Sequence, residues 1–220
     1  MALCTAGWLS STAPVFQDAV LAQCQWRSFG AAETISHGGD TSGGMFGIAL
    51  GSFSALPAVG AADTPIIHIG SGPFWYGTNP LNHAVPRSMS VVTRSPCIVA
   101  SIPQHALLSL LADDPAHWRY FFENVSEILA LVSQIATDLI LPDSLRRCIA
   151  VLLRVAGSRN SGMAPTVAEM TQDELAGMAN MSRQTTGAIV RRLSAKGLVT
   201  VGYRNIIVND PAALRTMLAG

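Results

Sequence analysis

The sequence predicts an α+β protein in three successive parts. Residues 1–113 are expected to form a small β-barrel or sandwich, residues 114–142 a long helix, and residues 143–220 a helix-turn-helix with a β-hairpin wing. Three observations predict this order. Glycine-punctuated short strands fill the first half, an apolar repeat of helical period follows, and two helices with recognisable caps lie near the end of the chain.

Composition predicts a folded protein. Of the 220 residues, 49% are hydrophobic and 13% are charged, so the chain has enough apolar surface to build a core, which excludes intrinsic disorder. No apolar run approaches the roughly 18 residues of a membrane span. The first residues lack the basic segment of a signal peptide. We therefore expect a cytoplasmic protein without a membrane partner.

Charge is distributed unevenly between the two halves of the chain. The 14 basic and 14 acidic residues cancel overall. Residues 1–140 hold four basic and nine acidic side chains, a net of −5, whereas residues 141–220 hold ten basic and five acidic ones, a net of +5. This asymmetry favours two domains with different partners and makes the basic part the candidate for binding a polyanion.

The first part contains short apolar runs separated by glycine turns. Pro14 is expected to open a short helix containing Phe16 and Val20. Strands are expected at Thr34–Ser36, Met45–Leu50, Ser52–Leu56, Ile66–Ile69, Met89–Thr93 and Cys97–Ser101. Several short strands with turn signals between them are typical of a small β-barrel or sandwich.

A long helix is expected over Pro115–Leu141. Its apolar residues alternate at spacings of three and four over three heptads, which is the seam of a coiled coil: Trp118, Phe121/Phe122, Val125, Ile128/Leu129, Val132, Ile135/Ala136 and Leu139. Two partners could cover this stripe, either the chain's own β part or a second copy across a two-fold axis. The length of the stripe favours the second copy, so we predict a homodimer.

The last part is expected to contain a series of short helices and a hairpin. Its helices are predicted at Ser144–Ala156, Thr171–Ala179, Ser182–Lys196 and Pro211–Ala219, and its strands at Leu198–Val201 and Asn205–Val208. Gly197 is placed to end the third of these helices in a left-handed conformation. Two short helices joined by a tight turn, with a hairpin after them, form a winged helix-turn-helix.

The second helix of this motif carries the chemistry of a DNA reader. Thr171 and Glu174 form a capping box for the first helix, and Ser182 caps the second, which begins Arg183-Gln184-Thr185-Thr186 with polar side chains on an exposed first turn. Arginine suits guanine and glutamine suits adenine in the major groove, and a capped helix start suits phosphate. The alternative for Arg183 is an ordinary solvated helix start. The whole arrangement favours double-stranded DNA as the partner.

Further positive charge comes from Arg191 on the same helix and from Arg204 at the tip of the hairpin, where it could reach a phosphate.

At these residues the sequence resembles the Crp/Fnr family of bacterial transcription regulators. The matching segment, Thr171–Val208, is TQDELAGMANMSRQTTGAIVRRLSAKGLVTVGYRNIIV. The order of a β-roll of the cyclic-nucleotide-binding type, a dimer helix and a winged helix is also similar, so the resemblance extends over nearly the whole chain. It implies that residues 1–113 form a double-stranded β-helix, a jelly-roll-like β-roll. It implies a DNA-binding regulator, with RNA polymerase as a further partner if the regulator activates transcription.

The resemblance also implies roles for single residues. It assigns Arg183 and Gln184 to bases, and Thr171, Ser182 and Thr185 to phosphates. The catabolite-activator branch has arginine where this chain has Ala188 and glutamate where it has Gln184. We therefore expect a half-site different from that of the catabolite-activator branch.

An effector pocket in the β-roll is the second implication. Cyclic-AMP-binding members carry a Gly-Glu pair and then an Arg-Ser pair, and the corresponding residues here are Gly77-Thr78 and Arg87-Ser88. Arg87-Ser88 suits an anion, but Thr78 replaces the ribose-binding glutamate, which argues against a cyclic nucleotide as cofactor. Two alternatives stay open: a small effector in this pocket, or a purely structural β-roll whose interior is filled by Phe74-Trp75-Tyr76.

Other chemistries find little support in the sequence. Cys4, Cys24, Cys97 and Cys148 are too widely spaced for a zinc site or for the cysteine cluster of an iron–sulfur sensor. His83 or Cys97 could be offered as a haem ligand, but no pattern supports it. The enzyme alternative is a cupin-like metal site, and its spacing of histidines and a carboxylate is missing around His68. We expect neither catalytic activity nor a metal.

Overall fold

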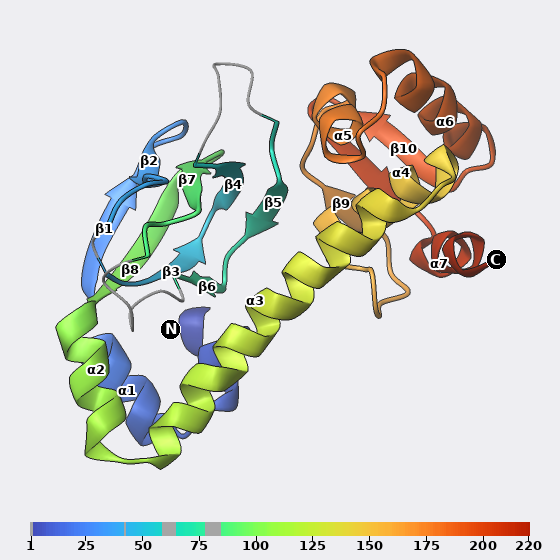
Figure 1. Ribbon diagram of the computed structural model, residues 1–220. Coiled ribbons are helices and arrows are strands. Elements are labelled where there is room, and N and C mark those ends of the chain that lie inside the picture. The colour runs from blue at the N-terminus through green and yellow to red at the C-terminus, as the bar shows by residue number, and fades with distance from the viewer. Residues whose placement is uncertain (1, 42, 59–64, 78–84) are drawn as a thin grey trace. The chain divides into compact units, whose positions relative to one another are not determined.

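The computed structural model describes residues 2–41, 43–58, 65–77 and 85–220 (Figure 1). Its contacts divide the chain into two units, one of residues 1–64 and 70–131, the other of residues 65–69 and 132–220. The long helix α3, Ala116–Ile140, contributes its first part to the first unit and its last part to the second. No helix in the described ranges is long and apolar enough to cross a membrane.

The first unit contains two four-stranded sheets, which confirms the predicted α+β class with a β-rich N-terminal part. The strand order is β1-β8-β3-β6 in one sheet and β2-β7-β4-β5 in the other. The first sheet consists of β1 (Gln25–Phe29), β8 (Cys97–Pro103), β3 (Gly44–Leu50) and β6 (Phe74–Tyr76). The second consists of β2 (Thr34–Ser36), β7 (Met89–Thr93), β4 (Ser52–Pro57) and β5 (His68–Ser71), of which His68 and Ile69 are grouped with the second unit.

Helices precede and follow these sheets in the chain. Two short 3-10 turns, η1 (Ala2–Cys4) and η2 (Trp8–Ser11), lead into α1 (Pro14–Ala22), which begins at Pro14 as predicted. After β8 the chain forms α2 (Gln104–Asp113), which packs against α1 (Figure 1). Helix α2 was not expected, and neither were strands β1 and β6. The strand expected at Ile66–Ile69 lies two residues later, because the chain stays extended through Gly70 instead of turning there.

Large aromatic side chains fill the core of the first unit. Trp8 and Trp75 are buried and meet edge to face, with ring centroids 5.5 Å apart. Phe16 packs edge to face on Trp8 at 6.2 Å. Edge-to-face pairs of this kind add to the free energy gained from burial. They join the N-terminal helices to strand β6.

Helix α3 has two different apolar stripes. Phe121 is 4% exposed and packs into the core of the first unit, whereas its neighbour Phe122 is 68% exposed. The exposed stripe continues through Leu129, Val132 and Leu139. The pair Phe121/Phe122 thus separates into one residue that faces the core of the first unit and one that faces solvent.

The second unit is built on α4 (Ser144–Val155), and its helices and hairpin form as predicted. Around α4 lie β9 (Thr166–Ala168), α5 (Gln172–Met178), α6 (Arg183–Ala195), β10 (Val199–Gly202), β11 (Asn205–Val208) and α7 (Pro211–Ala219). The three strands pair in the order β10-β11-β9. Strand β9 was not expected. Seven consecutive residues of α4, from Cys148 to Arg154, are buried, so this helix is the centre of the unit.

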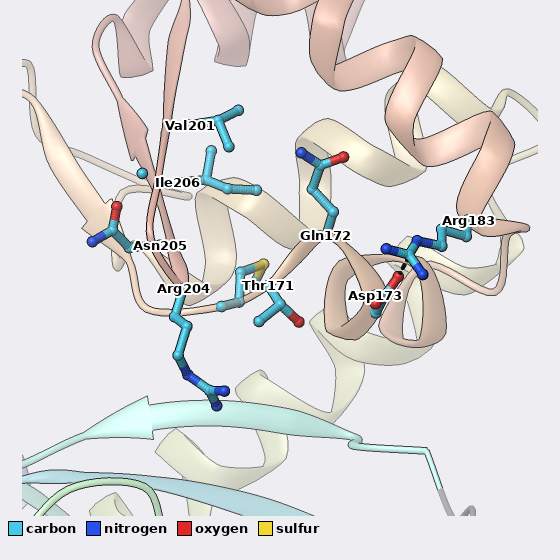
Figure 2. A pocket seen from close by; sticks show the side chains of 10 residues that line it. Thr171, Gln172, Asp173, Arg183, Val201, Arg204, Asn205 and Ile206 are labelled. Atoms are coloured by element: carbon cyan, nitrogen blue, oxygen red, sulfur yellow. Dashed lines mark ion pairs between the residues drawn. The ribbon is translucent and has the colours of Figure 1, made fainter.

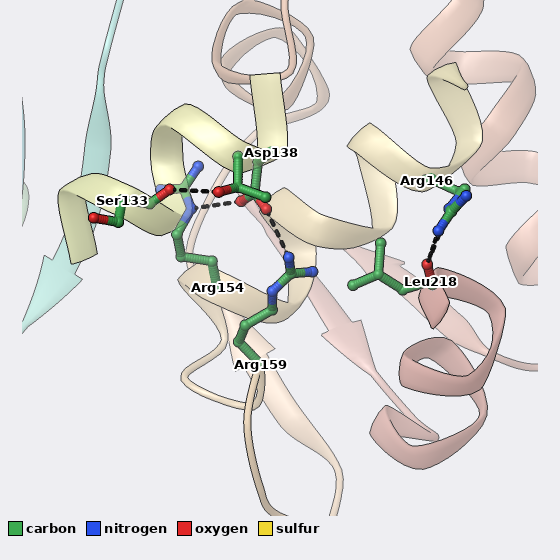
Figure 3. A network of polar contacts seen from close by, with 7 residues as sticks. Ser133, Asp138, Arg146, Arg154, Arg159 and Leu218 are labelled. Atoms are coloured by element: carbon green, nitrogen blue, oxygen red, sulfur yellow. Dashed lines mark hydrogen bonds and ion pairs between the residues drawn. The ribbon is translucent and has the colours of Figure 1, made fainter. Parts of the chain in front are cut away.

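A buried ion-pair network joins the end of α3 to α4 (Figure 3). The Asp138 side chain is 1% exposed and forms two ion pairs. Its Oδ2 lies 3.0 Å from Nε of Arg154, and its Oδ1 lies 2.8 Å from Nη2 of Arg159. Burial lowers the pKa of Arg154, and the hydrogen bond that Arg154 donates to Asp138 opposes that shift. Arg154 also lies 3.1 Å from Nδ1 of His68. Asp138 thus balances the positive charge that α4 carries into the interior.

Candidate nucleic-acid interface

The turn between α5 and α6 is closed by backbone hydrogen bonds. Asn180 has a φ of 50°, in the left-handed region that asparagine tolerates better than most residues. Its N–H donates to the Gly177 carbonyl at 3.1 Å, and the N–H of Met181 donates to the Ala176 carbonyl at 2.9 Å. These two bonds form a Schellman motif that ends α5. They fix the direction in which the chain leaves for α6.

Helix α6 is capped at both ends. Ser182 Oγ accepts from the N–H of Thr185 at 3.1 Å, as predicted for an N-cap. At the other end Gly197 has a φ of 72°, and the N–H of Leu198 donates to the Leu193 carbonyl at 3.0 Å. This confirms Gly197 as the residue that ends the helix. The helix is therefore fully formed within the chain itself.

The predicted capping box of α5 is also present. Thr171 Oγ1 accepts from the N–H of Glu174 at 3.2 Å, and the Glu174 carboxylate accepts from the N–H of Thr171 at 2.7 Å. The hydroxyls of Thr171 and Ser182, which the family resemblance assigns to phosphates, are thus already used as caps. An exposed hydroxyl oxygen at a cap can still meet a phosphate from outside, and Ser182 is exposed.

A groove of about 260 Å³ lies between the start of α5, the start of α6 and the hairpin (Figure 2). Its polar lining comes from three elements that are distant in sequence: Thr171, Gln172, Asp173, Arg183, Arg204 and Asn205. Figure 2 shows Arg204 on the hairpin side and Arg183 on the helix side of this groove. A concave surface bordered by two guanidinium groups suits a phosphate backbone.

The predicted base-recognising residues lie together on the first turn of α6. Arg183, Gln184 and Thr185 are exposed, and the Arg183 side chain is 82% exposed. The expectation that Thr186 shares this exposed turn is wrong, because Thr186 is fully buried. At 100° per residue it falls on the same face as Val190 and Leu193, which belong to the core.

The two outlying arginines lie at different places. Arg191 is exposed on α6, and its Nη1 would be 3.4 Å from a Cβ placed on Gly187. Arg204 lies at the hairpin tip with a φ of 55°, a left-handed conformation that costs a non-glycine residue on the order of 1 kcal/mol. This conformation of the hairpin tip places the Arg204 side chain at the groove.

Three polar lining residues were not singled out as site residues from the sequence: Gln172, Asp173 and Asn205. Asp173 forms an ion pair with Arg183, with 2.8 Å between Oδ1 and Nε. The two residues are ten positions apart, and only the helix-turn-helix geometry brings them together. The dipole of a helix favours an acidic residue in the first turn, such as Asp173 in α5. Because this local reason is sufficient, the sequence gives no sign that Asp173 also pairs with Arg183.

The predicted effector residues of the β-roll are only partly brought together. Arg87 is 9% exposed, its Nη2 donates to the Gly44 carbonyl at 3.1 Å, and its guanidinium carbon lies 4.9 Å from the centroid of the Phe46 ring. A Cβ on Gly77 would lie 3.1 Å from Arg87 Nη1, so these two residues are neighbours. Ser88 is exposed, and Thr78 lies outside the described residues. Burial lowers the pKa of Arg87, and Tyr76 and Asp40 oppose the shift.

The aromatic run on β6 packs against other rings. Trp75 is 2% exposed, Phe74 stacks on Phe53 at 5.3 Å, and Tyr76 stacks on Phe46 at 5.3 Å. This packing supports a structural role for the run.

The remaining candidate chemistries were centred on cysteine and histidine. Burial raises the pKa of the Cys24 and Cys148 thiols to about 12, so both stay protonated at neutral pH. Among the described residues, no three His, Cys, Asp or Glu side chains gather around one point. His83, offered as a haem ligand, lies outside the described residues.

Comparison with known proteins supports the fold and the presence of a helix-turn-helix domain. The sequence profile of the Crp-like helix-turn-helix domain matches residues 146–217. The cAMP-activated global transcriptional regulator CRP of Haemophilus influenzae is 22% identical over 194 residues, 87% of each chain.

Two solved structures are similar over most of this chain. A CRP/FNR-family transcriptional regulator from Thermus thermophilus superposes with a TM-score of 0.69 at 17% identity, covering 89% of this chain and 99% of its own. The c-di-GMP responsive global regulator CLP of Xanthomonas campestris superposes with a TM-score of 0.68 at 19% identity, covering 90% of this chain and 99% of its own.

Proposed function

We propose that this chain, whose residues 146–217 match the Crp-like helix-turn-helix domain, is a transcription regulator of the Crp/Fnr type. In this proposal it binds a near-palindromic operator as a homodimer and inserts the start of α6 into the major groove. In this proposal Arg183 and Gln184 contact base edges. Thr171, Ser182, Thr185, Arg191 and Arg204 contact the phosphate backbone. The two α6 helices of the dimer lie about 34 Å apart, one helical turn of DNA.

The groove between α5, α6 and the hairpin is the observation that carries this proposal. It places Arg183 and Arg204 on opposite sides of one concave surface. The first turn of α6 is exposed, while the rest of the motif packs onto a continuous core. Direct readout of bases requires a well-packed helix that presents exposed Arg and Gln side chains to the major groove, and α6 has this arrangement.

The test is selection of bound sites from random duplex DNA by the purified protein. We expect an inverted repeat with half-sites one helical turn apart. In the same assay Arg183→Ala should weaken binding to the selected site by about 1–3 kcal/mol and relax the preference at one base position per half-site. Lys196→Ala removes the same charge about 20 Å further along α6 and should leave the base preference unchanged.

Two results would contradict this assignment. If the selection enriches no sequence, the ligand-free protein does not recognise an operator, and the proposal is contradicted. Equal loss of affinity for selected and random DNA in Arg183→Ala would make Arg183 a phosphate contact instead of a base contact.

The homodimer is supported by the exposed stripe on α3. Phe122, Leu129, Val132 and Leu139 follow heptad spacing and are 44–68% exposed in the single chain. A seam of this kind is covered when two copies pack side by side. Leu129→Glu should therefore shift the protein toward monomer in analytical ultracentrifugation, whereas Ala130→Glu, one exposed position outside the seam, should not.

The β-roll has two alternative roles. In the first, a small anionic effector binds at Gly77, Thr78, Arg87 and Ser88 and changes the affinity for DNA. Named relatives respond to cAMP and to c-di-GMP, which supports this alternative. In the second, the roll is only structural, which the packing of Trp75 supports.

Titration with cAMP and with c-di-GMP, followed by calorimetry and by operator binding, distinguishes the two roles. A response that Arg87→Met abolishes indicates a sensor. Operator binding that neither the nucleotides nor Arg87→Met alters removes both nucleotides as effectors and favours a structural roll.

The rest of the proposal concerns organisation and setting. We divide the chain into a β-roll over residues 1–113, a dimer helix over 114–142 and a DNA-binding domain over 143–220. We place the protein in the cytoplasm, as a regulator and not an enzyme, with RNA polymerase as a partner if it activates transcription.

A further inference from the structure

The acidic residue at the edge of the groove has no place in the function proposed so far. Asp173 is the only acid among the ten residues that line the groove. A carboxylate beside a phosphate backbone opposes binding, because like charges repel. The dipole of α5 favours an acidic residue in its first turn, but that gain is the same with or without DNA, so an effect of Asp173 on DNA recognition must come from its contact with Arg183.

This effect follows from the geometry of the ion pair. Asp173 Oδ1 contacts Nε of Arg183 at 2.8 Å (Figure 2). A bond to Nε leaves the two terminal amino groups of the guanidinium available for the O6 and N7 atoms of a guanine. The carboxylate can thus stay on Arg183 while Arg183 contacts a base.

Without this partner, Arg183 would have many other conformations. Its side chain is 82% exposed, and an exposed arginine has considerable rotamer freedom. On DNA of any sequence, a free guanidinium can turn to a phosphate near the helix start. The Asp173 carboxylate on α5 opposes this rotation, because Arg183 must break its ion pair with Asp173 before it can reach the phosphate.

We infer that Asp173 is a positioning residue that sets the sequence specificity of Arg183: it lowers the affinity for DNA of any sequence and increases the discrimination at the base pair that Arg183 contacts. The inference rests on the proposed function, because it needs Arg183 at a base edge. The pair is exposed in the free protein, where such pairs contribute little stability. Its effect comes when DNA excludes water and the local dielectric falls.

The experiment compares Asp173→Asn with the unmodified full-length protein on the selected operator, on operators changed at single base pairs, and on random duplex DNA. Asp173→Asn should bind random DNA more tightly. Its discrimination at the Arg183 base pair should fall by at least about twofold, because the pair becomes stronger than an exposed ion pair once DNA excludes water. The slope of log K against log salt on random DNA should steepen by about 0.9, one additional phosphate contact.

Two controls separate positioning from a general effect of charge or of folding. Glu169→Gln removes the same charge from the same unit outside the groove and should leave base discrimination unchanged. In the Arg183→Ala background, Asp173→Asn should also leave the base preference unchanged, because Asp173 acts through Arg183. The far-ultraviolet circular dichroism of every variant is measured before binding.

Three results would overturn the inference. The first is unchanged discrimination in Asp173→Asn. The second is an equal change in Glu169→Gln. The third is a loss of discrimination that persists without Arg183. If the unmodified protein itself selects no sequence, the proposed function fails first, and that result is seen before any variant is compared.

Discussion

Replacing Asp138 by asparagine perturbs the charge balance at the centre of the second unit. The change keeps the shape of the side chain and removes its negative charge. Arg154 then stays in the interior, where its side chain is 2% exposed, without a counter-charge. Arg159, whose side chain is 17% exposed, loses the same partner and can turn toward solvent.

The expected cost follows from this burial. Removing one partner of a buried ion pair destabilises a protein by about 3–5 kcal/mol, because the remaining charge stays uncompensated. The asparagine oxygen still accepts one hydrogen bond, which places the expected loss near the lower end, about 3 kcal/mol. Glu123→Gln is the matched control on the same helix. Its pair with Arg119 is exposed, at 37% and 79%, so it should cost less than about 0.5 kcal/mol.

The assay uses the distribution of tryptophan along the chain. All four tryptophans, Trp8, Trp26, Trp75 and Trp118, lie in the first unit. Intrinsic fluorescence during urea unfolding therefore follows that unit, while far-ultraviolet circular dichroism follows both. In Asp138→Asn we expect part of the dichroism signal to be lost at lower urea while the fluorescence transition changes little.

A second variant tests the reason for the loss. Arg154→Met in the Asp138→Asn background removes the unpaired charge and should restore most of the lost stability. A loss below about 1 kcal/mol in Asp138→Asn would mean that water reaches the pair, and the reasoning from burial would then fail. No recovery in the double variant would show that the hydrogen bonds, and not the charge, carry the stability.

Three further predictions concern single positions. Burial lowers the pKa of His68 from 6.5 to about 3, so as the pH falls the unfolded chain takes up the proton first. The free energy of unfolding should decrease between pH 6.5 and pH 3, by at most about 2 kcal/mol at pH 5, and His68→Gln should flatten this dependence in urea titrations. Thr171→Ala removes the cap of α5 and should cost about 1 kcal/mol in thermal unfolding, whereas Thr171→Ser should cost little. Gly51→Ala places a Cβ against the Pro96 carbonyl at a φ of 93° and should cost about 2 kcal/mol or more, unlike Gly157→Ala, which has open space around it and pays only for its left-handed backbone.

Local signals account for the elements that the sequence predicts well. Proline at the start of α1, the capping box at Thr171, the serine cap at Ser182 and the glycine after α6 each act within a few residues of the structure they specify. The long helix is also predicted to within one residue at each end, because its apolar period persists over many turns. Such elements are predictable because their causes are contained in the same short segment.

The elements that were missed lack such local causes. Helix α2 begins after Pro103 without any side-chain cap, and β9 has only three residues, held by its pairing with β11. Asp138 is a polar residue on an amphipathic helix, a pattern typical of an exposed position. Its burial depends on arginines that follow 16 and 21 residues later. The same holds for the pair of Asp173 and Arg183, which no spacing rule anticipates.

Helix α6 is closed at both ends by its own chain, and this has a consequence for the kinetics and thermodynamics of recognition. A recognition helix that formed only on the DNA would add the heat-capacity change and the ordering entropy of a folding reaction to those of binding. Here that contribution should be absent for α6, so the heat-capacity change on binding should match the apolar surface covered at the interface. Association should likewise be fast and governed by ionic strength, because electrostatic steering and not a folding step sets its rate.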